Sequence, residues 1–465
     1  MKKLLQWVLC GAVMLSATSC KKYLEIIPRG QKIPQTLADF KALMEHKDAH
    51  TVDYSNQVYV SNEFKFMLST QASNTIANIN YNWQEDKDRV SFLQTDYGYT
   101  SAYKGIFINN VVINHMHEAT TGTAEEKAAV VAQAKTNRAM MYFYLVNSYA
   151  KTYDAATAAT DPGVLINTKD EMEQTLKQAT VKEVYEFMIK DLNEAIPNLP
   201  EVASSPFIPG KGTAYALLAR INMFMRNYTD AKGFADKALA SNNTLYDWVK
   251  LYYDNKKVAD STAPSINVGK FEFTNTENYT FNYGGSIAQL QGFYISFLQE
   301  ADSSYYDAGD ARFKINFAKR KVGAETIWSY RRMDDPNVGG IRTPEMYYIK
   351  AECLAREGKP ADAMLELDKV RRKRIITEFF TPSTATTEAQ AIANIRRELR
   401  NEYRGTGLPY LDYRRFNVDP VYKATLTKNE YGTIYSITPE SHIWIIPFSQ
   451  VAINYSEGQL TQNSK

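Results

Sequence analysis

Cysteine is scarce in this chain of 465 residues, which contains only three. Cys10 lies in an apolar N-terminal segment and Cys20 directly follows that segment, so Cys353 is the single cysteine of the remaining chain. One thiol cannot form an internal disulfide, and a large apolar core must therefore stabilise the fold. Apolar residues make up 44% of the sequence, which is enough for such a core. We expect Cys353 to be a small buried residue and not a nucleophile.

An excess of charge of one sign is also missing. The sequence has 54 basic and 52 acidic residues, and removal of residues 1–19 takes away two lysines, which leaves 52 of each sign. A protein that binds nucleic acid needs a net or strongly clustered positive field. The balance therefore argues against a nucleic-acid partner.

Apolar runs long enough to cross a bilayer as a helix are absent from the sequence. The longest run, residues 4–15, follows two lysines and precedes four small residues and Cys20. This order is typical of a lipoprotein export signal, in which the cysteine is acylated and becomes the new N-terminus. Ala17 stands where the common bacterial lipobox has leucine, so a plain secretory cleavage is the alternative. We predict a signal peptide over residues 1–19, lipidation of Cys20, and contact with the membrane through this anchor alone.

Motifs of catalysis and cofactor binding are missing as well. The sequence has no GxSxG, HExxH, phosphate-binding or dinucleotide-binding pattern. His115 and His117 would lie on different faces of a helix, without a third ligand nearby. Glu398 and Glu402 would share one helix face, whereas a glycosidase places its two acids across a cleft. Arginines at 396, 397 and 400 favour solvated ion pairs for these two glutamates. We therefore predict no enzyme activity, no cofactor and no metal site.

A helix hairpin with apolar faces at helical spacing is the clearest pattern that is present. Residues 212–240 predict two helices with a turn near residues 226–228, and the small residues Ala219, Ala231 and Ala238 allow the helices to approach closely. The pattern returns 132 positions later, over residues 343–372, and aligns without a gap. The spacing resembles the tetratricopeptide repeat, with Asn227 or Gly358 in the turn. Two unrelated helix pairs that share small residues are the alternative.

The remaining segments divide the chain into regions. Further helices are predicted over residues 37–44, 103–119, 124–149, 181–196 and 387–403. Residues 251–342 instead show strand-like alternation at 270–273 and 279–281 beside pairs of glycines. The sequence therefore predicts a mainly α fold in one domain, residues 20–465. Tetratricopeptide-like hairpins form its scaffold (about 31–250 and 343–416), with a loop-rich insertion containing short strands on the ligand side (251–342) and a C-terminal docking tail (417–465).

Several short segments share the order and spacing of a known family. They are YLE (23–25), PRG (28–30), NRA (137–139), YFYL (142–145), KGTAYALLARINMFMRNYTDA (211–231), DARF (310–313), VRRKR (370–374), IRRE (395–398), IPFSQ (446–450) and LTQN (460–463). These segments resemble the SusD/RagB-like outer-membrane nutrient-binding lipoproteins of Bacteroidetes. Leu399, Thr406 and Pro409 replace charged residues often found in that family, which puts a local salt-bridge network in doubt.

The resemblance implies a function and a location. A family member would sit on the outer membrane by its lipid anchor, face the cell exterior, capture an oligosaccharide and deliver it to a SusC-like TonB-dependent transporter. Lys21 and Lys22 stand where an acidic run often marks surface export, so the periplasmic leaflet is the alternative location. A RagB-like lid that binds peptides and a helical-repeat adaptor that binds only proteins are the alternative functions.

Aromatic residues beside amides, on loops, are the candidates for contact with a sugar, because sugar rings pack on flat aromatic faces while amides meet the hydroxyls. Three loops have this composition, and the residues that we predict as ligand contacts are Asn80, Tyr81, Trp83, Tyr283 and Trp328. No family motif fixes these positions, and burial in the core is the alternative for each. Trp444, in an apolar part of the tail, is expected in the core.

Overall fold

The computed structural model describes residues 34–66, 75–171, 176–268, 273–284, 296–299, 304–322, 325–331 and 337–465. The predicted signal peptide and Cys20 lie outside these residues, as do residues 270–272 of the expected strand at 270–273. Within the described residues, no helix combines the length and apolar character needed to cross a membrane.

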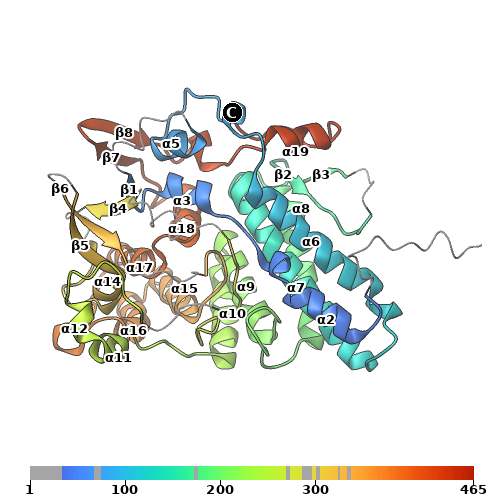
Figure 1. The fold of residues 1–465 in the computed structure, drawn as a ribbon, viewed down its shortest axis with the longest axis horizontal. Coiled ribbons are helices and arrows are strands. Elements are labelled where there is room, and N and C mark those ends of the chain that lie inside the picture. The colour runs from blue at the N-terminus through green and yellow to red at the C-terminus, as the bar shows by residue number, and fades with distance from the viewer. Residues whose placement is uncertain are drawn as a thin grey trace, which may run out of the picture.

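Helices dominate the first half of the chain, as the sequence predicts (Figure 1). In chain order they are α2 (Leu37–Glu45), η2 (Lys47–His50), α3 (Ser55–Ser61), α5 (Ile76–Tyr81), η3 (Val90–Phe92), α6 (Tyr97–His115), η4 (Met116–Glu118), α7 (Ala124–Tyr149), α8 (Val181–Ala195) and η5 (Ile196–Asn198). The strands β2 (Pro162–Leu165) and β3 (Gln178–Thr180) pair between α7 and α8. The helix α6 begins earlier than predicted because Asp96 caps it by accepting from the N–H groups of Gly98 and Tyr99. The predicted capping box at Thr180 and Glu183 is confirmed.

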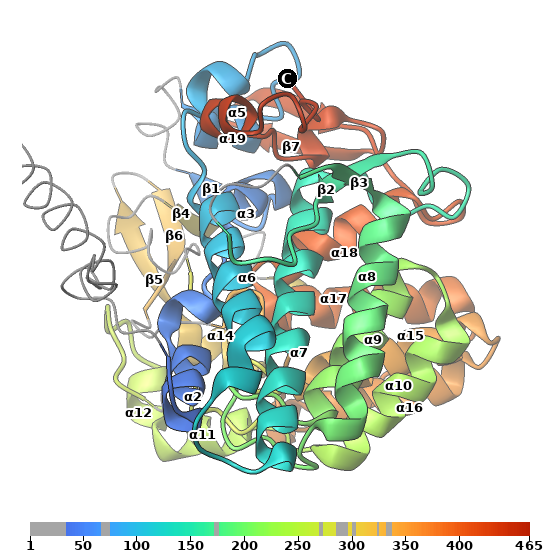
Figure 2. The same cartoon turned by 90° about the vertical axis from the view of Figure 1, so that its right-hand side faces the viewer.

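The two predicted hairpins are confirmed and are stacked on each other. The first consists of α9 (Lys211–Phe224) and α10 (Tyr228–Ser241), and the second of α15 (Thr343–Arg356) and α16 (Pro360–Arg371). The helix α10 packs on α15, and Lys350 Nζ lies 2.8 Å from Asp236 Oδ1 across that contact. The neighbours α7, α8 and α17 (Glu388–Tyr403) cover the two ends of the stack (Figure 2). A hairpin cannot bury its apolar face alone, and this stacking supplies the cover.

The turns of the two hairpins also correspond. Gly358 adopts a left-handed φ of 76°, and the residue at the equivalent position in the first hairpin, Arg226, has a φ of 61°. The left-handed residue of the first turn is therefore Arg226 and not Asn227, which lies one position later. Glycine adopts this conformation at the lowest cost, and Arg226 is held in it by contacts with Val418 and Asp154.

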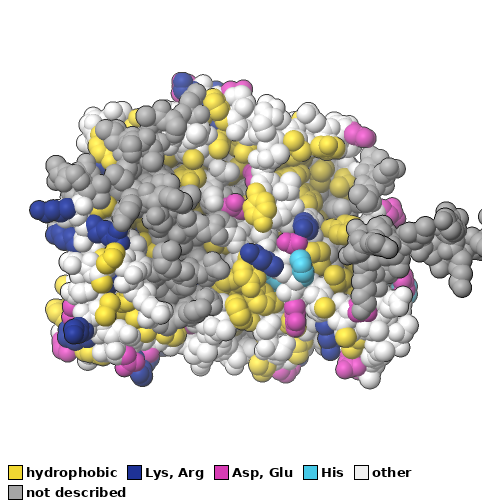
Figure 3. Space-filling model, viewed as in Figure 1, with side chains coloured by type: hydrophobic (Ala, Val, Ile, Leu, Met, Phe, Trp, Pro, Cys, Tyr) yellow, Lys and Arg dark blue, Asp and Glu magenta, His cyan; other side chains and the backbone are white. Residues whose placement is uncertain are grey.

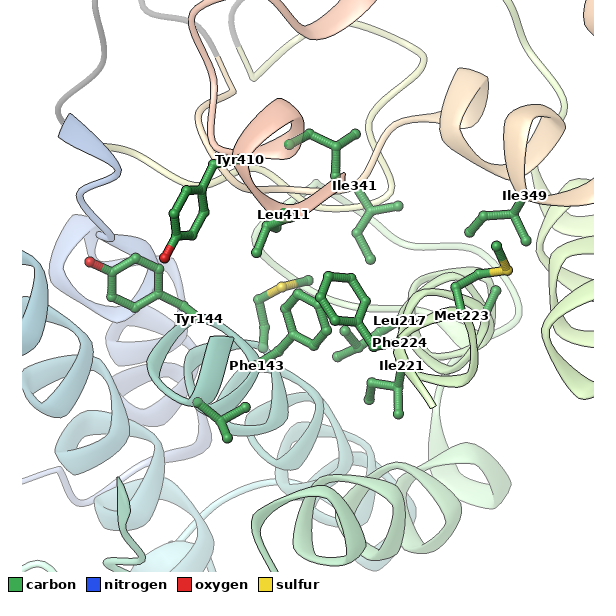
Figure 4. Close-up of a cluster of buried hydrophobic side chains, with 14 of the residues drawn as sticks. Phe143, Tyr144, Leu217, Ile221, Met223, Phe224, Ile341, Ile349, Tyr410 and Leu411 are labelled. Atoms are coloured by element: carbon green, nitrogen blue, oxygen red, sulfur yellow. The ribbon is translucent and has the colours of Figure 1, made fainter. Parts of the chain in front are cut away.

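Small and aromatic residues form the core between the hairpins and α7. Ala219, Ala231, Ala238 and Ala351 are fully buried. The rings of Phe143 and Phe224 meet edge to face with their centroids 5.1 Å apart, and Figure 4 shows them beside Leu217 and Ile221. Cys353 is buried as predicted, with its Sγ 3.7 Å from the sulfur of Met223, and burial raises the pKa of the thiol to about 12.

The predicted insertion contains short strands and also helices that the sequence analysis missed. Its strands β4 (Ser296–Gln299), β6 (Glu325–Tyr330) and β5 (Phe317–Val322) form an antiparallel sheet with β1 (Lys65–Phe66) of the N-terminal part, in the order β1-β4-β6-β5. The helices are α11 (Trp248–Asp254), α12 (Lys256–Ala259) and α14 (Ala311–Asn316). Residues 279–281 form no strand. The sheet and these helices lie at the opposite side of the molecule from α6, α7 and α8 (Figures 1 and 2).

The C-terminal tail docks on the N-terminal part of the chain. It follows η8 (Thr377–Phe379), α17 and α18 (Leu408–Asn417), and it contains β7 (Leu426–Glu430), β8 (Thr433–Ile437), η9 (His442–Trp444) and α19 (Gln450–Tyr455). The guanidinium of Arg89 donates to the carbonyl oxygens of His442 and Ile445 at 2.9 and 2.8 Å. Trp444 is buried, which confirms its assignment to the core.

A buried ion network joins the insertion to the scaffold. Its members are Glu277, Asp310, Arg312, Arg342, Arg374, Glu398 and Glu402. Glu402 is its centre, because its carboxylate lies 2.9 Å from Arg312, 2.8 Å from Arg342 and 2.8 Å from Arg374. The departures at Leu399, Thr406 and Pro409 do not remove the network, since its members come from distant elements.

The network corrects our expectation for Glu398 and Glu402. We predicted solvated pairs with the arginines at 396, 397 and 400, but only 1% of each glutamate side chain is exposed. Arg397 alone of these three contacts either glutamate, at 3.2 Å from Glu398. The reason is that α17 packs against α15, α16 and α18, so the face that carries both glutamates points into the protein.

The first prediction concerns the close approach of the hairpin helices. Ala219 is fully buried in α9, whereas Ala240 is exposed on α10. We expect Ala219→Leu to lower the free energy of unfolding by about 1–3 kcal/mol through overpacking, and Ala240→Leu to change it by less than ~0.5 kcal/mol. Denaturant titration of the two variants measures both values. Equal unfolding midpoints for the two variants would contradict the tight stacking.

The second prediction concerns Glu402. Burial alone would raise the pKa of Glu402, but the guanidinium groups of Arg374, Arg342 and Arg312 outweigh it and hold the pKa well below the usual glutamate range. Its ionised form therefore stabilises the fold above about pH 4.3, and that contribution is lost as the pH falls below this value. We expect Glu402→Gln to lower the free energy of unfolding by about 3–5 kcal/mol at pH 7, with a smaller difference from the wild type at acid pH.

The matched control is Glu186→Gln, because Glu186 is 61% exposed in a single pair with Lys182 on α8. This variant should differ from the wild type by less than about 0.5 kcal/mol at either pH. Urea titrations at several pH values measure the differences. A Glu402→Gln variant as stable as the wild type at pH 7 would show that the network does not hold the insertion.

Candidate ligand-binding sites

The first of the three predicted loops is in part a helix, because Asn80 and Tyr81 are the last residues of α5, and these two residues and Trp83 are buried. Asn80 Oδ1 accepts from Arg89 at 3.1 Å, Tyr81 Oη donates to Glu430 at 2.6 Å, and Trp83 Nε1 donates to the carbonyl of Val60 at 2.9 Å. All three side chains are at most 4% exposed. These polar groups are therefore already bonded within the protein.

The aromatic faces of this loop are occupied as well. Lys428 Nζ lies 3.4 Å from the ring centroid of Tyr81 and 4.5 Å from that of Trp83. Burial lowers the pKa of Lys428 to about 7. The lysine thus fastens the β7–β8 hairpin to α5, and a sugar would reach either ring only after this contact opened. Direct contact of a ligand with these residues remains a prediction.

Trp328 lies on β6, in the sheet of the insertion. Its ring meets Phe313 edge to face at 4.7 Å between centroids, and Lys319 Nζ lies 5.7 Å from its centroid. The side chain is half-buried, and its Nε1 is buried with no hydrogen-bond partner among the residues that the structure describes. Figure 3 shows basic side chains at this edge of the molecule, whereas elsewhere on the same face basic and acidic groups alternate. A ligand contact at Trp328 likewise remains a prediction.

Tyr283 belongs to a cluster of four aromatic rings, with Phe207, Phe273 and Phe281. It stacks on Phe207 with the centroids 5.4 Å apart and the planes 12° apart, and Lys47 Nζ lies 5.2 Å from its centroid. Phe207 in turn contacts Phe273 at 5.6 Å. Phe273 is 40% exposed and lines a large cavity, so the aromatic cluster extends to the edge of that cavity.

That cavity, which we call the amide-rich cleft, has a volume of about 630 Å³. Its walls are the loop before α9, the first residues of α9, the end of α10 and the segment that follows Phe273. The lining residues are Val202, Ala203, Ser204, Ser205, Pro206, Gly210, Gly212, Thr213, Ser241, Asn242, Phe273, Thr274, Asn275, Thr276, Asn278 and Tyr279. None of them is charged, so the cleft offers amides, hydroxyls and aromatic surface.

Hydrogen bonds fix the polar groups of the amide-rich cleft. Asn242 Nδ2 donates to the carbonyl of Thr276 at 3.0 Å, and Thr213 Oγ1 donates to the carbonyl of Tyr279 at 2.9 Å. Asn275 Oδ1 accepts from the N–H of Glu277 at 2.9 Å, whereas its Nδ2 is buried and has no partner within the described part of the chain. A buried donor without a partner is costly, and a ligand oxygen can satisfy it.

The sequence analysis did not find this cleft. It named Tyr283, which stacks on Phe207 but does not line the cleft, and it missed SSPF (204–207) and TNTEN (274–278), whose small polar residues beside phenylalanines are the same signal. Spacing in the sequence does not show that these segments meet. The stacked hairpin brings them together, because the start of α9 and the end of α10 lie at the same end of it.

Metal ligands do not gather in the described part of the chain, where no three of the residues His, Cys, Asp and Glu are placed to hold an ion. His115 instead contacts two carboxylates, Glu118 at 2.8 Å and Asp170 at 2.7 Å.

Comparison with known proteins assigns the family. A model described as "Starch-binding associating with outer membrane" (SusD-like) matches residues 22–223, and the SusD/RagB model, described as "SusD family", matches residues 296–464. A SusD-like protein of Bacteroides ovatus is 21% identical over 350 residues, which are 65% of this chain and 60% of that protein. The chain thus spans about 60% of the length of this curated relative.

Solved structures share the fold over nearly the whole chain. A SusD superfamily protein from Bacteroides thetaiotaomicron superposes with a TM-score of 0.72 at 18% identity, covering 92% of this chain and 100% of that structure. A SusD-like carbohydrate binding protein from Bacteroides vulgatus has a TM-score of 0.66 at 18% identity, with 92% and 97% covered. Surface glycan-binding protein A from Bacteroides uniformis has a TM-score of 0.65 at 17% identity, with 91% and 98% covered. With family models matched at both ends of one tetratricopeptide-like fold, the chain belongs to the SusD/RagB-like family, as its motifs predicted.

Proposed function

We propose that this chain captures oligosaccharides in the amide-rich cleft and delivers them to a SusC-like TonB-dependent transporter of the outer membrane. The observation that carries the proposal is the amide donor of Asn275, which has no partner among the described residues, in an uncharged cavity beside the exposed ring of Phe273. The names of the B. vulgatus and B. uniformis proteins, which refer to carbohydrate and glycan binding, support the same class of ligand.

The chemistry of the cleft suits a neutral sugar. A sugar hydroxyl accepts from the Asn275 amide and also donates to the oxygen atoms of serines and threonines in the walls. The flat, apolar side of a pyranose ring packs on Phe273. Binding of this kind involves no bond cleavage, which agrees with a role as a binding protein and not as an enzyme.

Lipidation of Cys20 would serve delivery. A protein tethered by its first residue stays at high effective concentration over a membrane partner and can still pivot to admit a ligand. This arrangement favours a lid over the transporter at the cell exterior. The peptide-binding lid and the protein-only adaptor remain the alternatives, and binding measurements separate all three.

The third prediction tests the cleft. Phe273→Ala removes the exposed ring and Asn275→Ala removes the unpartnered donor, so each should weaken binding of the captured glycan about tenfold. Isothermal titration of the purified chain against neutral plant, host and microbial oligosaccharides and a peptide mixture measures the affinities. Tyr455→Ala is the matched control, because Tyr455 is 84% exposed on α19 and does not line the cleft.

Three results would contradict this assignment. Loss of binding in Trp328→Ala alone would move the site to the sheet of the insertion. Binding of peptides but of no oligosaccharide would favour the peptide-binding lid. Binding of neither ligand class by a folded chain that still associates with the transporter would favour the adaptor.

The fourth prediction tests the tether. Without the acylated thiol the chain has no anchor, so Cys20→Ala should move the protein from the membrane fraction to the soluble fraction of the cell. Co-purification with a TonB-dependent transporter should fall in parallel, whereas glycan affinity of the purified variant should stay unchanged. Retention of Cys20→Ala in washed membranes at the wild-type level would exclude Cys20 as the anchor.

A further inference from the structure

A second cavity, which we call the arginine pocket, lies between α17, α18 and the segment that precedes α14. Its volume is about 420 Å³. The lining residues are Tyr305, Ala393, Arg396, Arg397, Arg400, Asn401, Arg404, Tyr413 and Leu426. Four of these nine residues are arginines, three of α17 and Arg404 directly after its end, and none is acidic. Residues 397 and 400 are three positions apart, so their side chains lie along one face of α17, and Arg404 follows the last residue of that helix.

Carboxylates that do not line the pocket pair with two of these arginines and hold them in position. Arg396 Nε lies 2.8 Å from Asp412, and Arg400 Nε lies 3.1 Å from Glu63. Arg404 is anchored by donation from Nε to Tyr306 at 3.1 Å and from Nη1 to the carbonyl of Glu63 at 2.9 Å. The guanidinium groups are therefore fixed before any ligand arrives, which lowers the entropy cost of binding.

Two arginine N–H groups in this pocket lack a hydrogen-bond acceptor among the described residues. Arg404 Nη2 and Arg397 Nε are buried and have no hydrogen-bond partner among the residues that the structure describes. The side chain of Arg404 is only 5% exposed, so water at the surface does not satisfy its free donor. A buried guanidinium donor without an acceptor is costly, and an anionic oxygen is the acceptor that it binds most strongly.

The rest of the lining supplies aromatic surface and one acceptor. The guanidinium of Arg400 lies between Tyr305 and Tyr413, at 5.3 and 5.6 Å from their ring centroids. Tyr305 is 43% exposed and can pack on a ring. Asn401 Oδ1 is also buried without a partner among the described residues, so the pocket can accept one hydroxyl proton.

We infer that the arginine pocket binds the carboxylate of an acidic sugar, a uronic acid residue in an oligosaccharide ligand, and this inference rests on the proposed function of oligosaccharide capture. The carboxylate meets the free donors of Arg397 and Arg404, one hydroxyl donates to Asn401, and the sugar ring packs on Tyr305. A peptide fits less well, because its backbone N–H groups need acceptors and the arginines offer only donors.

The test compares two trisaccharides that differ only in charge. One consists of three uronic acid residues, and the other is the same compound with its carboxylates reduced to primary alcohols. Calorimetric titration of the purified chain should give at least about tenfold tighter binding of the acidic compound, and Arg397→Gln should reduce this ratio to nearly one. Arg372→Gln, an exposed arginine outside the pocket, should leave the ratio unchanged. Arg397 is the preferred site because its side chain is 38% exposed and its replacement spares the fold.

Each of the other possible results would contradict a particular part of this inference or of the proposed function. Equal affinity for the two trisaccharides would overturn the arginine pocket as an acid site, while binding that depends on Phe273 would leave the cleft standing. Tighter binding of a tripeptide with a free carboxylate than of the uronic acid compound, lost in Arg397→Gln, would overturn the sugar assignment. A ratio that survives Arg397→Gln and Arg404→Gln in folded protein would place the acid selectivity outside this pocket. Binding of no oligosaccharide at all would refute the proposed function itself.

Discussion

The contact of Glu402 with three arginines is the constraint on which the arrangement of this protein depends. A carboxylate that is 1% exposed is costly unless its charge is paired, and Arg312, Arg342 and Arg374 pair it from three different segments. Movement of the insertion away from α17 would separate Glu402 from Arg312 and Arg342 and leave its buried carboxylate with Arg374 alone of the three. The ion network therefore fixes where the insertion sits on the helical scaffold, more specifically than apolar packing alone would do.

The ion network also fixes the position of residues that line the amide-rich cleft. Glu277 has a fully buried side chain and bonds to Arg342 at 2.9 Å and to Arg374 at 2.7 Å. The cleft residues Asn275 and Asn278 lie on either side of it in the chain, and the Glu277 N–H orients the amide of Asn275. The buried ion network thus holds an uncharged wall of the amide-rich cleft in position from the protein interior. This separation lets the cleft present neutral donors and acceptors while the charges remain paired in the interior.

The sequence predicted what depends on local spacing. Alanines at helical positions, capping residues and a repeat of 132 positions were enough to predict the hairpins, and the order of short motifs was enough to predict the family. It did not predict contacts between residues far apart in the chain. Tyr81 bonds to Glu430, 349 positions later, and that contact buries an aromatic loop that its composition alone suggested as a sugar site. The glutamates of α17 were misread for the same reason, since Arg312 and Arg342 lie in the insertion.

The charged residues of α17 take part in two different arrangements, which differ in whether every charged group has a partner. On one face, Glu398 and Glu402 neutralise arginines of other elements, and every charge there has a partner at 2.9 Å or less. In the arginine pocket, Asp412 pairs with Arg396 and Glu63 pairs with Arg400, whereas Nε of Arg397 and Nη2 of Arg404 have no hydrogen-bond partner among the described residues. The first arrangement is complete without a ligand. The second is incomplete in the same structural element, and a ligand anion is the group that completes it.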